Sequence, residues 1–260
     1  MRNFRRYGKP PYKIAVIHGG PGAAGEMAPV ARKLSKRNGV LEPLQTKDSI
    51  NGQVEELKKV LEEYGSPPVV LIGWSWGAWL ALIFAAKYPE SVEKLILVSS
   101  GPFEEKYAEL VMNTRLERLS VVEKEELYNL NNSLNDPRYK NKDQLFTRFG
   151  EISDKTDTFS ALDDTLPEVS VNYNIYKKVW REAEELRQRG KLLQEAKLVR
   201  CPVLAIHGVY DPHPSDGVRL LSEYVRNFRI ILLDKCGHAP WKERFAHGYF
   251  YEILKSELSD

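Results

Sequence analysis

Short apolar runs recur over the first hundred residues of the chain and return after residue 200. Apolar and polar positions do not alternate within these runs, which is typical of strands buried on both faces of a parallel sheet. We expect the second run to form a weak strand, because Pro43 suits only a sheet edge. The pattern predicts about six strands, at 13–18, 40–44, 69–72, 94–99, 202–207 and 229–233.

Segments with helical spacing of apolar residues separate these runs. Strands that alternate with helices form a sheet with right-handed crossovers and helices on both faces. The predicted fold class is therefore α/β, with a mostly parallel sheet. The expected helices lie at 29–37, from 51 or 52 to before Pro67, from the third strand to about Tyr88, at 216–225 and at 245–258.

The middle of the chain, residues 101–199, has a different pattern. Charge density rises there, buried-strand runs vanish, and helical periodicity with polar faces appears at 104–119, 121–134 and 173–189. The acidic stretch 153–172 contains Pro167 and predicts a loop or short helices. We expect a helical insertion at 101–199 in a core made of residues 1–100 and 200–260.

Composition adds limits on partners and compartment. The 260 residues carry a net charge of +2 with both signs interspersed, which favours neither nucleic-acid nor membrane binding. No apolar signal core follows the basic N-terminus, so a cytoplasmic protein is expected. Cys201 and Cys236 lack metal-ligand spacing, although a bridge between them stays open because both would lie near strand ends.

The third predicted strand leads into Gly73-Trp74-Ser75-Trp76-Gly77, and an alanine-rich helix follows. A serine between a buried strand and a helix sits on a tight, strained turn with its hydroxyl above the sheet. The Gly-x-Ser-x-Gly pattern by itself is weak evidence, since an ordinary glycine-rich turn also fits it. The strand before it and the helix after it favour a nucleophile.

A serine hydroxyl becomes a good nucleophile only when a base removes its proton and a third group orients that base. Asp211 follows the fifth predicted strand and His238 follows the sixth. The carboxyl ends of parallel strands meet at one sheet edge, where ligands bind. The order Ser75, Asp211, His238 therefore predicts a catalytic triad, with Gly237 allowing the loop before His238 to turn sharply.

The loop 18–22, His-Gly-Gly-Pro-Gly, follows the first predicted strand. An acyl-transfer site needs two fixed donors for the developing oxyanion, and backbone N–H groups serve well. We expect one donor to be the N–H of Trp76, the residue after the serine. The second should come from the glycine loop, at Gly20.

Together these motifs resemble the α/β-hydrolases that carry a cap domain between their later strands. The resemblance covers nearly the whole chain, and the 18–22 loop with Ser75-Trp76 is also similar to the prolyl iminopeptidase branch, which cleaves N-terminal residues from peptides. Two features depart from that branch. Ala23 stands where a further glycine is usual, and the opening antiparallel strands of the family are absent or reduced to residues 4–12.

The resemblance also ranks the alternatives for base and acid. In the family, histidines at strand ends, such as His18 and His207, are structural. His213 is only two residues from Asp211, too near to be its expected triad partner. His247 lies on the predicted terminal helix and is expected at the surface. The rival site for the acid is the loop after the fourth strand, with Glu104 and Glu105. The competing histidines are His18, His207, His213 and His247.

The tryptophans near Ser75 and the acidic residues of the insertion are expected to have structural roles. Trp74, Trp76 and Trp79 are expected in the core. The acidic residues of the insertion are expected to be solvated, and only an aminopeptidase needs one or two of them in the pocket, to pair with a substrate ammonium. These residues are Asp163, Asp164, Glu182, Glu184 and Glu185.

The predicted function is a serine hydrolase that cleaves a carboxylic ester or amide of a small molecule or short peptide through an acyl-enzyme. No metal or organic cofactor is implied. Three alternatives stay open: a prolyl iminopeptidase-like aminopeptidase, a non-hydrolytic enzyme such as a lyase, and a catalytically silent binding protein. Serine at position 75 argues against chemistry that uses an aspartate nucleophile, and the intact triad argues against a silent protein.

Overall fold

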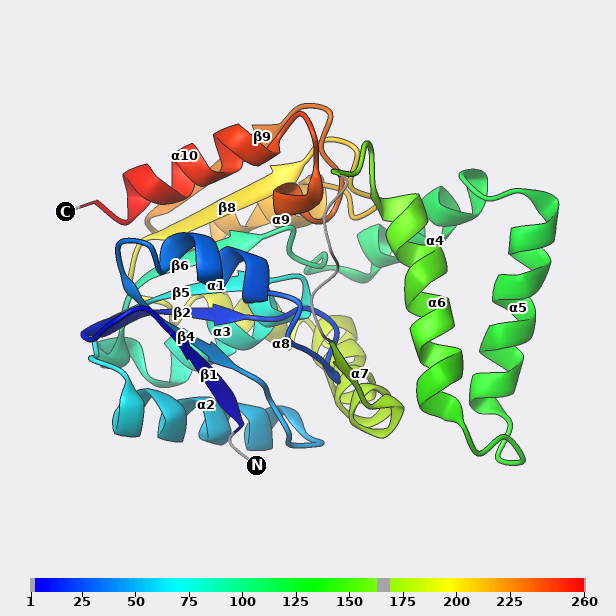
Figure 1. Ribbon diagram of the computed structural model, residues 1–260, viewed down its shortest axis with the longest axis horizontal. Coiled ribbons are helices and arrows are strands. Elements are labelled where there is room, and N and C mark those ends of the chain that lie inside the picture. Colours follow the sequence, from blue (N-terminus) through cyan, green and yellow to red (C-terminus); the bar gives the residue numbers. More distant parts are fainter. Residues whose placement is uncertain (1–2, 163–168, 260) are drawn as a thin grey trace.

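The computed structural model describes residues 3–162 and 169–259. Across these residues a seven-stranded sheet forms the centre of the molecule (Figure 1). Six neighbouring strands are parallel, and the first strand of the chain is antiparallel to its neighbour. In their order across the sheet the strands are β1 (Phe4–Tyr7), β4 (Gly39–Pro43), β2 (Tyr12–Ile17), β5 (Val69–Trp74), β6 (Val92–Val98), β8 (Val203–Gly208) and β9 (Phe228–Leu233).

The predicted α/β class and the six parallel strands are confirmed, with two corrections at the first edge. The sheet has seven strands in the described residues, because Phe4–Tyr7 adds the antiparallel strand β1. β4 is therefore not an edge strand, since it lies between β1 and β2. Pro43 is tolerated there because it is the last residue of β4, where the ladder ends.

Both faces of the sheet are buried, which explains why the strand sequences do not alternate. Successive strand side chains point to opposite faces. Ala15 and Ile17 of β2 join one apolar cluster, whereas Ile14 and Val16 of the same strand join the other. Few positions of the central strands face water, so their runs are mainly apolar, whereas the edge strand β9 is only partly buried.

Helices cover the two faces as the alternating pattern predicts. One cluster includes residues of α1 (Ala28–Leu34) and α10 (His247–Glu257). The other includes residues of α2 (Ile50–Tyr64), α3 (Trp76–Lys87) and α9 (Asp216–Arg219). Short 3-10 turns stand at Pro89–Ser91, Leu220–Glu223 and Pro240–Lys242.

Between β6 and β8 the described chain is mainly helical. Its elements are α4 (Glu105–Glu117), α5 (Val121–Asn135), α6 (Lys142–Asp157), β7 (Ser170–Val171), α7 (Tyr173–Gln188) and α8 (Lys191–Ala196). The periodicity found α4, α5 and α7 but not α6 or α8. The stretch 153–172, expected to be a loop or short helices, begins with the end of α6, which runs to Asp157. Asp163, Asp164 and Pro167 lie outside the described residues.

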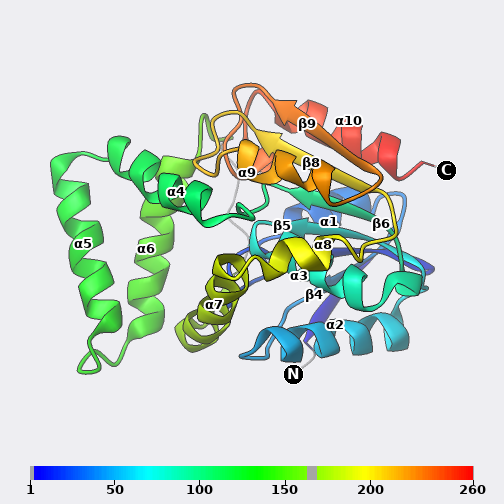
Figure 2. The same cartoon turned by 180° about the vertical axis from the view of Figure 1, so that it is seen from behind.

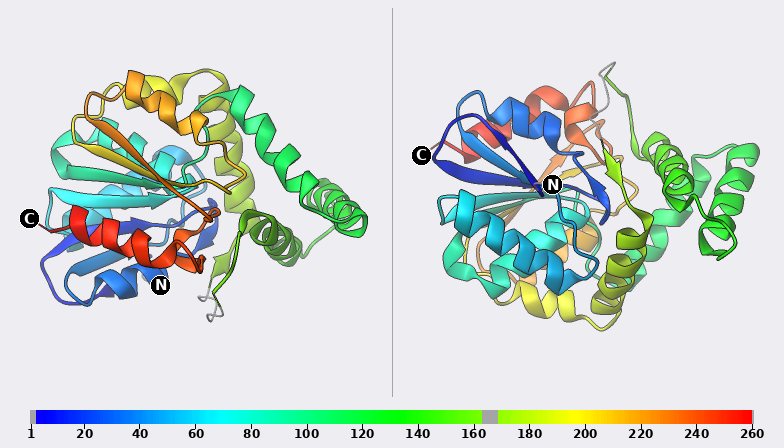
Figure 3. Two further views of the ribbon diagram at one scale, coloured as in Figure 1. Left: turned by 90° about the horizontal axis from the view of Figure 1, so that it is seen from above. Right: turned by 60° about the horizontal axis from the view of Figure 1, so that its bottom comes forward.

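These helices divide into two groups. α5 and α6 lie side by side and project away from the sheet in every view (Figures 1, 2 and 3). They share a small apolar cluster of their own, around Leu127, Leu130 and Ile152. α7 and α8 instead add Val179 and Leu192 to the main core. We call α4–α6, residues 105–157, the helical arm.

Two sequence expectations concern single features. Both cysteines are free and buried; Cys201 precedes β8 and Cys236 follows β9, so they stand at opposite ends of parallel strands. In the described part of the chain, no helix has the length and apolar character needed to span a bilayer.

Candidate active site

Ser75 occupies the sharp turn between β5 and α3. Its backbone lies at φ 53° and ψ −116°, a strained conformation for a residue with a side chain. The flanking glycines are required by contact: a Cβ on Gly73 would lie 2.2 Å from the Gly77 carbonyl oxygen, and one on Gly77 would lie 2.4 Å from the Ile17 carbonyl oxygen. Strand and helix therefore meet closely, and Ser75 remains half-buried at the carboxyl edge of the sheet.

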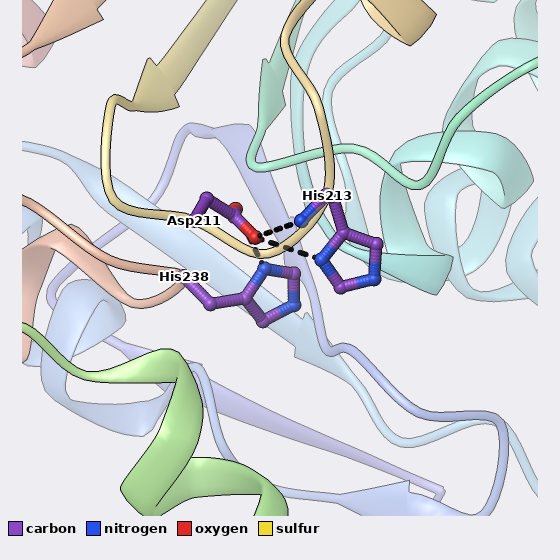
Figure 4. Close-up of side chains that lie close together, drawn as sticks. All are labelled: Asp211, His213 and His238. Carbon is purple, nitrogen blue, oxygen red and sulfur yellow. Dashed lines mark hydrogen bonds and ion pairs between the residues drawn. The ribbon is translucent and has the colours of Figure 1, made fainter. Parts of the chain in front are cut away.

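Asp211, in the loop after β8, contacts two imidazoles (Figure 4). Its Oδ2 atom is 2.8 Å from His238 Nδ1, and its Oδ1 atom is 2.7 Å from His213 Nδ1. The backbone N–H of His213 also donates to Oδ1, at 2.9 Å. The two imidazole rings stack, with centroids 4.4 Å apart.

The electrostatics of this cluster favour an ionised carboxylate. Burial alone would raise the pKa of Asp211, but His238, His213 and His207 keep it well below its usual value. Burial lowers the pKa of His213 to about 4, against the attraction of Asp211. Burial also acts to lower the pKa of His238, yet the charge and hydrogen bond of Asp211 raise it above its usual value. At neutral pH His213 is therefore a neutral imidazole.

The loop after β9 places His238 against β5 and the helical arm. The indole N–H of Trp74 donates to the His238 carbonyl at 2.7 Å, and the two rings are 5.2 Å apart. The His238 backbone N–H donates to the Asp157 carbonyl at 2.8 Å. A Cβ on Gly237 would lie 1.9 Å from that carbonyl oxygen, so close approach of the arm, and not a sharp turn, requires glycine there; the residue with positive φ in this loop is Lys235.

The arm contributes an ion pair beside this loop. Arg115 of α4 donates from Nε and Nη2 to the two carboxylate oxygens of Asp157, at 2.9 and 2.5 Å. Both side chains are largely buried. Asp157 thus joins α4, the end of α6 and the main chain of His238. Sequence periodicity gave no signal for this connection, because it links residues distant along the chain.

The structure brings the glycine loop to the serine. A Cβ on Gly19 would lie 3.2 Å from the Ser75 Cβ atom. Trp76 is the first residue of α3, where N–H groups have no acceptor within the helix, and Gly20 has a φ of 37°. Among the described residues, neither of these two N–H groups has an acceptor. Likewise, the Ser75 hydroxyl and His238 Nε2 bond to no described residue.

The rival histidines and carboxylates have other partners. His18 Nδ1 lies 2.7 Å from the Gly19 carbonyl, and His207 Nε2 lies 2.7 Å from the His213 carbonyl. His247 Nδ1 lies 2.8 Å from the Trp241 carbonyl. His213, by contrast, pairs with Asp211 although only two residues separate them, because the turn brings both its N–H and its ring to Oδ1. In the rival acid loop, Glu104 pairs with Lys106 and Glu105 with Arg187.

The tryptophans before and after Ser75 are core residues, as expected. Trp74, Trp76 and Trp79 are buried, and their indole N–H groups donate to His238, Gln53 and Gly101. Trp180 of α7 stacks on Trp79 with centroids 5.9 Å apart. The aromatic row on α7 continues with Tyr176, whose ring is 6.0 Å from that of Trp180.

The described acidic residues of α7 differ in their contacts. Glu182 accepts the backbone N–H of Ile50 at 2.8 Å, which turns it towards α2. Glu185 is exposed and lies 3.9 Å from Arg189. Glu184 is half-buried and accepts the indole N–H of Trp180 at 2.8 Å. Of these three, only Glu184 faces the aromatic row.

The Asp211 cluster is also the place where a cation could be held. Ligand atoms of Asp211, His213 and His238 lie within 4.8 Å of one another. However, the hydrogen bonds from both Nδ1 atoms to the carboxylate already account for this proximity. The arrangement fits an oriented base better than a set of metal ligands, since the carboxylate is occupied on both oxygens.

Comparison with known proteins agrees with this geometry. The family model of the alpha/beta hydrolase fold matches residues 45–240. A solved alpha/beta fold family hydrolase from Bacillus anthracis superposes with a TM-score of 0.69 at 17% identity, covering 98% of this chain and 94% of that one. The chain belongs to the α/β-hydrolase family.

Two kinds of enzyme are found among the curated relatives. Monoacylglycerol lipase ABHD6 of Homo sapiens is 25% identical over 209 residues, and the match covers 75% of this chain but only 57% of the relative. Proline iminopeptidase of Saccharolobus solfataricus is 24% identical over 277 residues, covering 93% of this chain and 83% of the relative. The chain therefore spans little more than half the length of the lipase relative and most of the peptidase.

Proposed function

We propose that this protein is a serine hydrolase that cleaves a carboxylic ester or amide of a small substrate through an acyl-enzyme. Ser75 Oγ attacks the carbonyl carbon, and His238 Nε2 takes the serine proton. His238 then protonates the leaving group, and water releases the acyl group by the reverse sequence. The observation that carries the proposal is the 2.8 Å bond between Asp211 and His238, at the sheet edge that also carries the strained Ser75.

Two imidazoles contact Asp211, and the position of Trp74 favours His238 as the base. Trp74 directly precedes Ser75, and its indole is bonded to the His238 main chain. Among the described residues, His213 has no ring contact or hydrogen bond with Trp74. Because His238 Nδ1 is bonded to the carboxylate, its Nε2 atom carries the lone pair that a general base needs.

The oxyanion would rest on the N–H groups of Gly20 and Trp76. The Trp76 N–H has no acceptor among the described residues and stands at the N-terminus of α3, where the helix dipole favours negative charge. Fixed donors of this kind each contribute on the order of 3 kcal/mol to transition-state stabilisation. No step of the proposed reaction uses a metal or an organic cofactor.

We further propose that residues 101–199 form a cap over a core of 1–100 and 200–260, and that this cap selects the substrate. The arm contacts the His238 loop through Asp157. A second contact joins β7 to β3 (Ala23–Ala24) next to the glycine loop, where the Asn172 N–H donates to the Gly22 carbonyl at 2.8 Å. Changes in the cap segment would thus reach both the base and an oxyanion donor.

Fluorophosphonate labelling tests the nucleophile directly. Wild-type protein is expected to react, and Ser75→Ala is expected to lose both labelling and turnover of short-chain acyl esters. Ser99→Ala is the matched control, because Ser99 also has a positive φ at the end of a sheet strand but is fully buried. Equal labelling of the wild type and Ser75→Ala would refute the assignment.

A second candidate is an aminopeptidase similar to the proline iminopeptidases. Glu184 favours it, as a half-buried carboxylate on the aromatic row of α7 that an ammonium group would recognise. This candidate predicts hydrolysis of aminoacyl-arylamides that stops when the substrate amine is acetylated. Glu184→Gln should then raise KM for the free amine, whereas Glu185→Gln should not. Equal turnover of free and acetylated substrates favours the esterase.

A further inference from the structure

Asp211 accepts three hydrogen bonds from two histidine residues, and this exceeds what a triad requires. One oxygen, Oδ2, serves His238. The other, Oδ1, receives both the ring Nδ1–H and the backbone N–H of His213. The Asp211 side chain is fully buried, so its two oxygens depend on these donors in place of water.

The partners of each ring fix where its protons lie. His207 Nε2 contacts the His213 carbonyl, which only accepts, so His207 carries its proton on Nε2. His213 Nδ1 contacts an ionised carboxylate and must also be the donor. His207 therefore anchors the main chain of His213, and His213 in turn anchors Asp211. The result is a chain of contacts that ends at His238.

We propose that His213 is a positioning residue of the site, whose Nδ1–H fixes the plane of the Asp211 carboxylate so that Oδ2 faces His238 Nδ1. The inference rests on the proposed function, in which His238 is the base. His213 acts through Asp211 and does not touch the reacting atoms. An imidazole suits this role because it donates at Nδ1 while its ring packs on His238, 4.4 Å away.

Few other groups near Asp211 could replace the Nδ1–H donor of His213. Arg115 and Asp157 are the charged groups of the arm that act on His238, and their charges oppose each other. His213, in the loop after β8, supplies two of the three hydrogen bonds that Asp211 accepts, and His238 supplies the third. His207 Nε2 lies farther away, at 3.7 Å from Oδ2. Loss of the ring donor would leave Oδ1 with the single backbone N–H, and rotation of the carboxylate about its Cβ–Cγ bond would be less restrained.

Two substitutions separate the donor from the ring. His213→Asn places an amide nitrogen where Nδ1 stood and so keeps the donor, whereas His213→Leu has similar bulk and no donor. Both remove ring stacking. His213→Leu is expected to lower kcat about tenfold or more with KM nearly unchanged, as for the loss of one hydrogen bond to a charged group. His213→Asn should stay within about threefold of wild type, and His247→Leu controls for loss of an imidazole that bonds to a main-chain carbonyl elsewhere.

A second readout needs no activity. The proton shared by His238 Nδ1 and Asp211 gives a downfield ¹H resonance, which should persist in His213→Asn and broaden or disappear in His213→Leu. Thermal melting shows whether each variant folds. If fluorophosphonate labelling survives Ser75→Ala, the proposed function fails while this resonance still decides the role of His213.

Three results would overturn the proposal. Wild-type kcat and an intact resonance in folded His213→Leu would mean that the donor is dispensable. Equal losses in the Asn and Leu variants would assign the effect to ring packing. A loss in His213→Leu as large as that in His238→Ala would make His213 the base itself.

Discussion

The carboxyl edge of the sheet and the helical arm are built on different principles. At the sheet edge, Gly73 and Gly77 lie so close to neighbouring backbone that neither position has room for a Cβ, and Ser75 is strained. In the arm, Gly150 of α6 has nothing within 4 Å of its Cβ position. The sheet edge rests on two large apolar clusters, the arm on a small one.

The difference indicates that the packing of the sheet edge and that of the arm are specified by separate sets of residues. At the sheet edge, close backbone packing leaves little room for a change of side chain. The arm presents Val121, Val122 and Tyr128 to solvent, and its outer ion pairs are exposed, so its surface tolerates change. The two regions meet at a buried contact, in which the His238 N–H donates to the Asp157 carbonyl, and Arg118 of the arm lies over the Tyr210 ring in the loop after β8. The predictions below probe the edge, this contact and the arm.

The largest effect is expected at the edge, from Asp211→Asn. An amide in this position can present its N–H₂ to His238 and stabilise the wrong tautomer, with the proton on Nε2. We expect kcat to fall by about 10⁴-fold with little loss of stability, as for other triads. Ester hydrolysis and thermal melting check this together. A variant with more than a tenth of wild-type kcat would exclude Asp211 as the orienting acid.

The contact between the two regions comes next. Asp157→Asn leaves the Arg115 cation buried and unpaired, so the free energy of unfolding should fall by about 3 kcal/mol. Glu126→Gln breaks the exposed pair with Arg148 in the same arm and should cost less than about 1 kcal/mol. Urea denaturation measures both. Equal small losses would show that Asp157 does not join the arm to the edge.

Gly77→Ala tests close packing at the edge itself. The added methyl group would lie 2.4 Å from the Ile17 carbonyl oxygen and 2.5 Å from that of His18, both backbone atoms that cannot move independently. We expect a loss of about 1–3 kcal/mol in stability, typical of overpacking, together with lower kcat as Ser75 shifts. Unchanged stability would mean that the turn is looser than its geometry indicates.

The sequence predicted the sheet edge far better than the arm. The apolar runs carry the strand signal because both sheet faces are buried, and Ser75, Asp211 and His238 each follow a strand. Chain order and sheet topology therefore place them near one another without any knowledge of side-chain contacts. The triad roles remain proposals, but the Asp211–His238 contact was expected from the sequence.

What the sequence missed depends on contacts between distant segments. Asp157 reaches the His238 backbone across the fold, and nothing near either residue signals the other. α6 and α8 were missed because they are mainly polar or short. The pairing of His213 with Asp211 does have a sequence signal, because only two residues separate them. Such a short separation argues against a triad pair, yet the turn between the two residues brings the His213 ring and N–H to Oδ1.

The pH dependence of kcat/KM tests whether the arm changes the pKa of His238. The base must be neutral, so kcat/KM should be constant above the pKa of His238 and fall about tenfold per unit below it. Asp157 raises that pKa, after Asp211, so Asp157→Asn should move the acid limb to lower pH. Glu126→Gln, at the exposed pair, should leave the limb in place. An unmoved limb in Asp157→Asn would confine the arm to a structural role.

The smallest effect is expected in the arm and has the opposite sign to that of Gly77→Ala. Gly150 lies in the middle of α6 at a solvent-exposed position, so the methyl group of an alanine would meet no other atom. The alanine would also reduce the conformational freedom of the unfolded chain. Gly150→Ala should therefore raise the free energy of unfolding by about 0.5–1 kcal/mol, with kcat unchanged. Urea denaturation of Gly77→Ala and Gly150→Ala side by side measures the contrast. If both variants lose stability, α6 is packed as tightly as the sheet edge, and the distinction between the two regions fails.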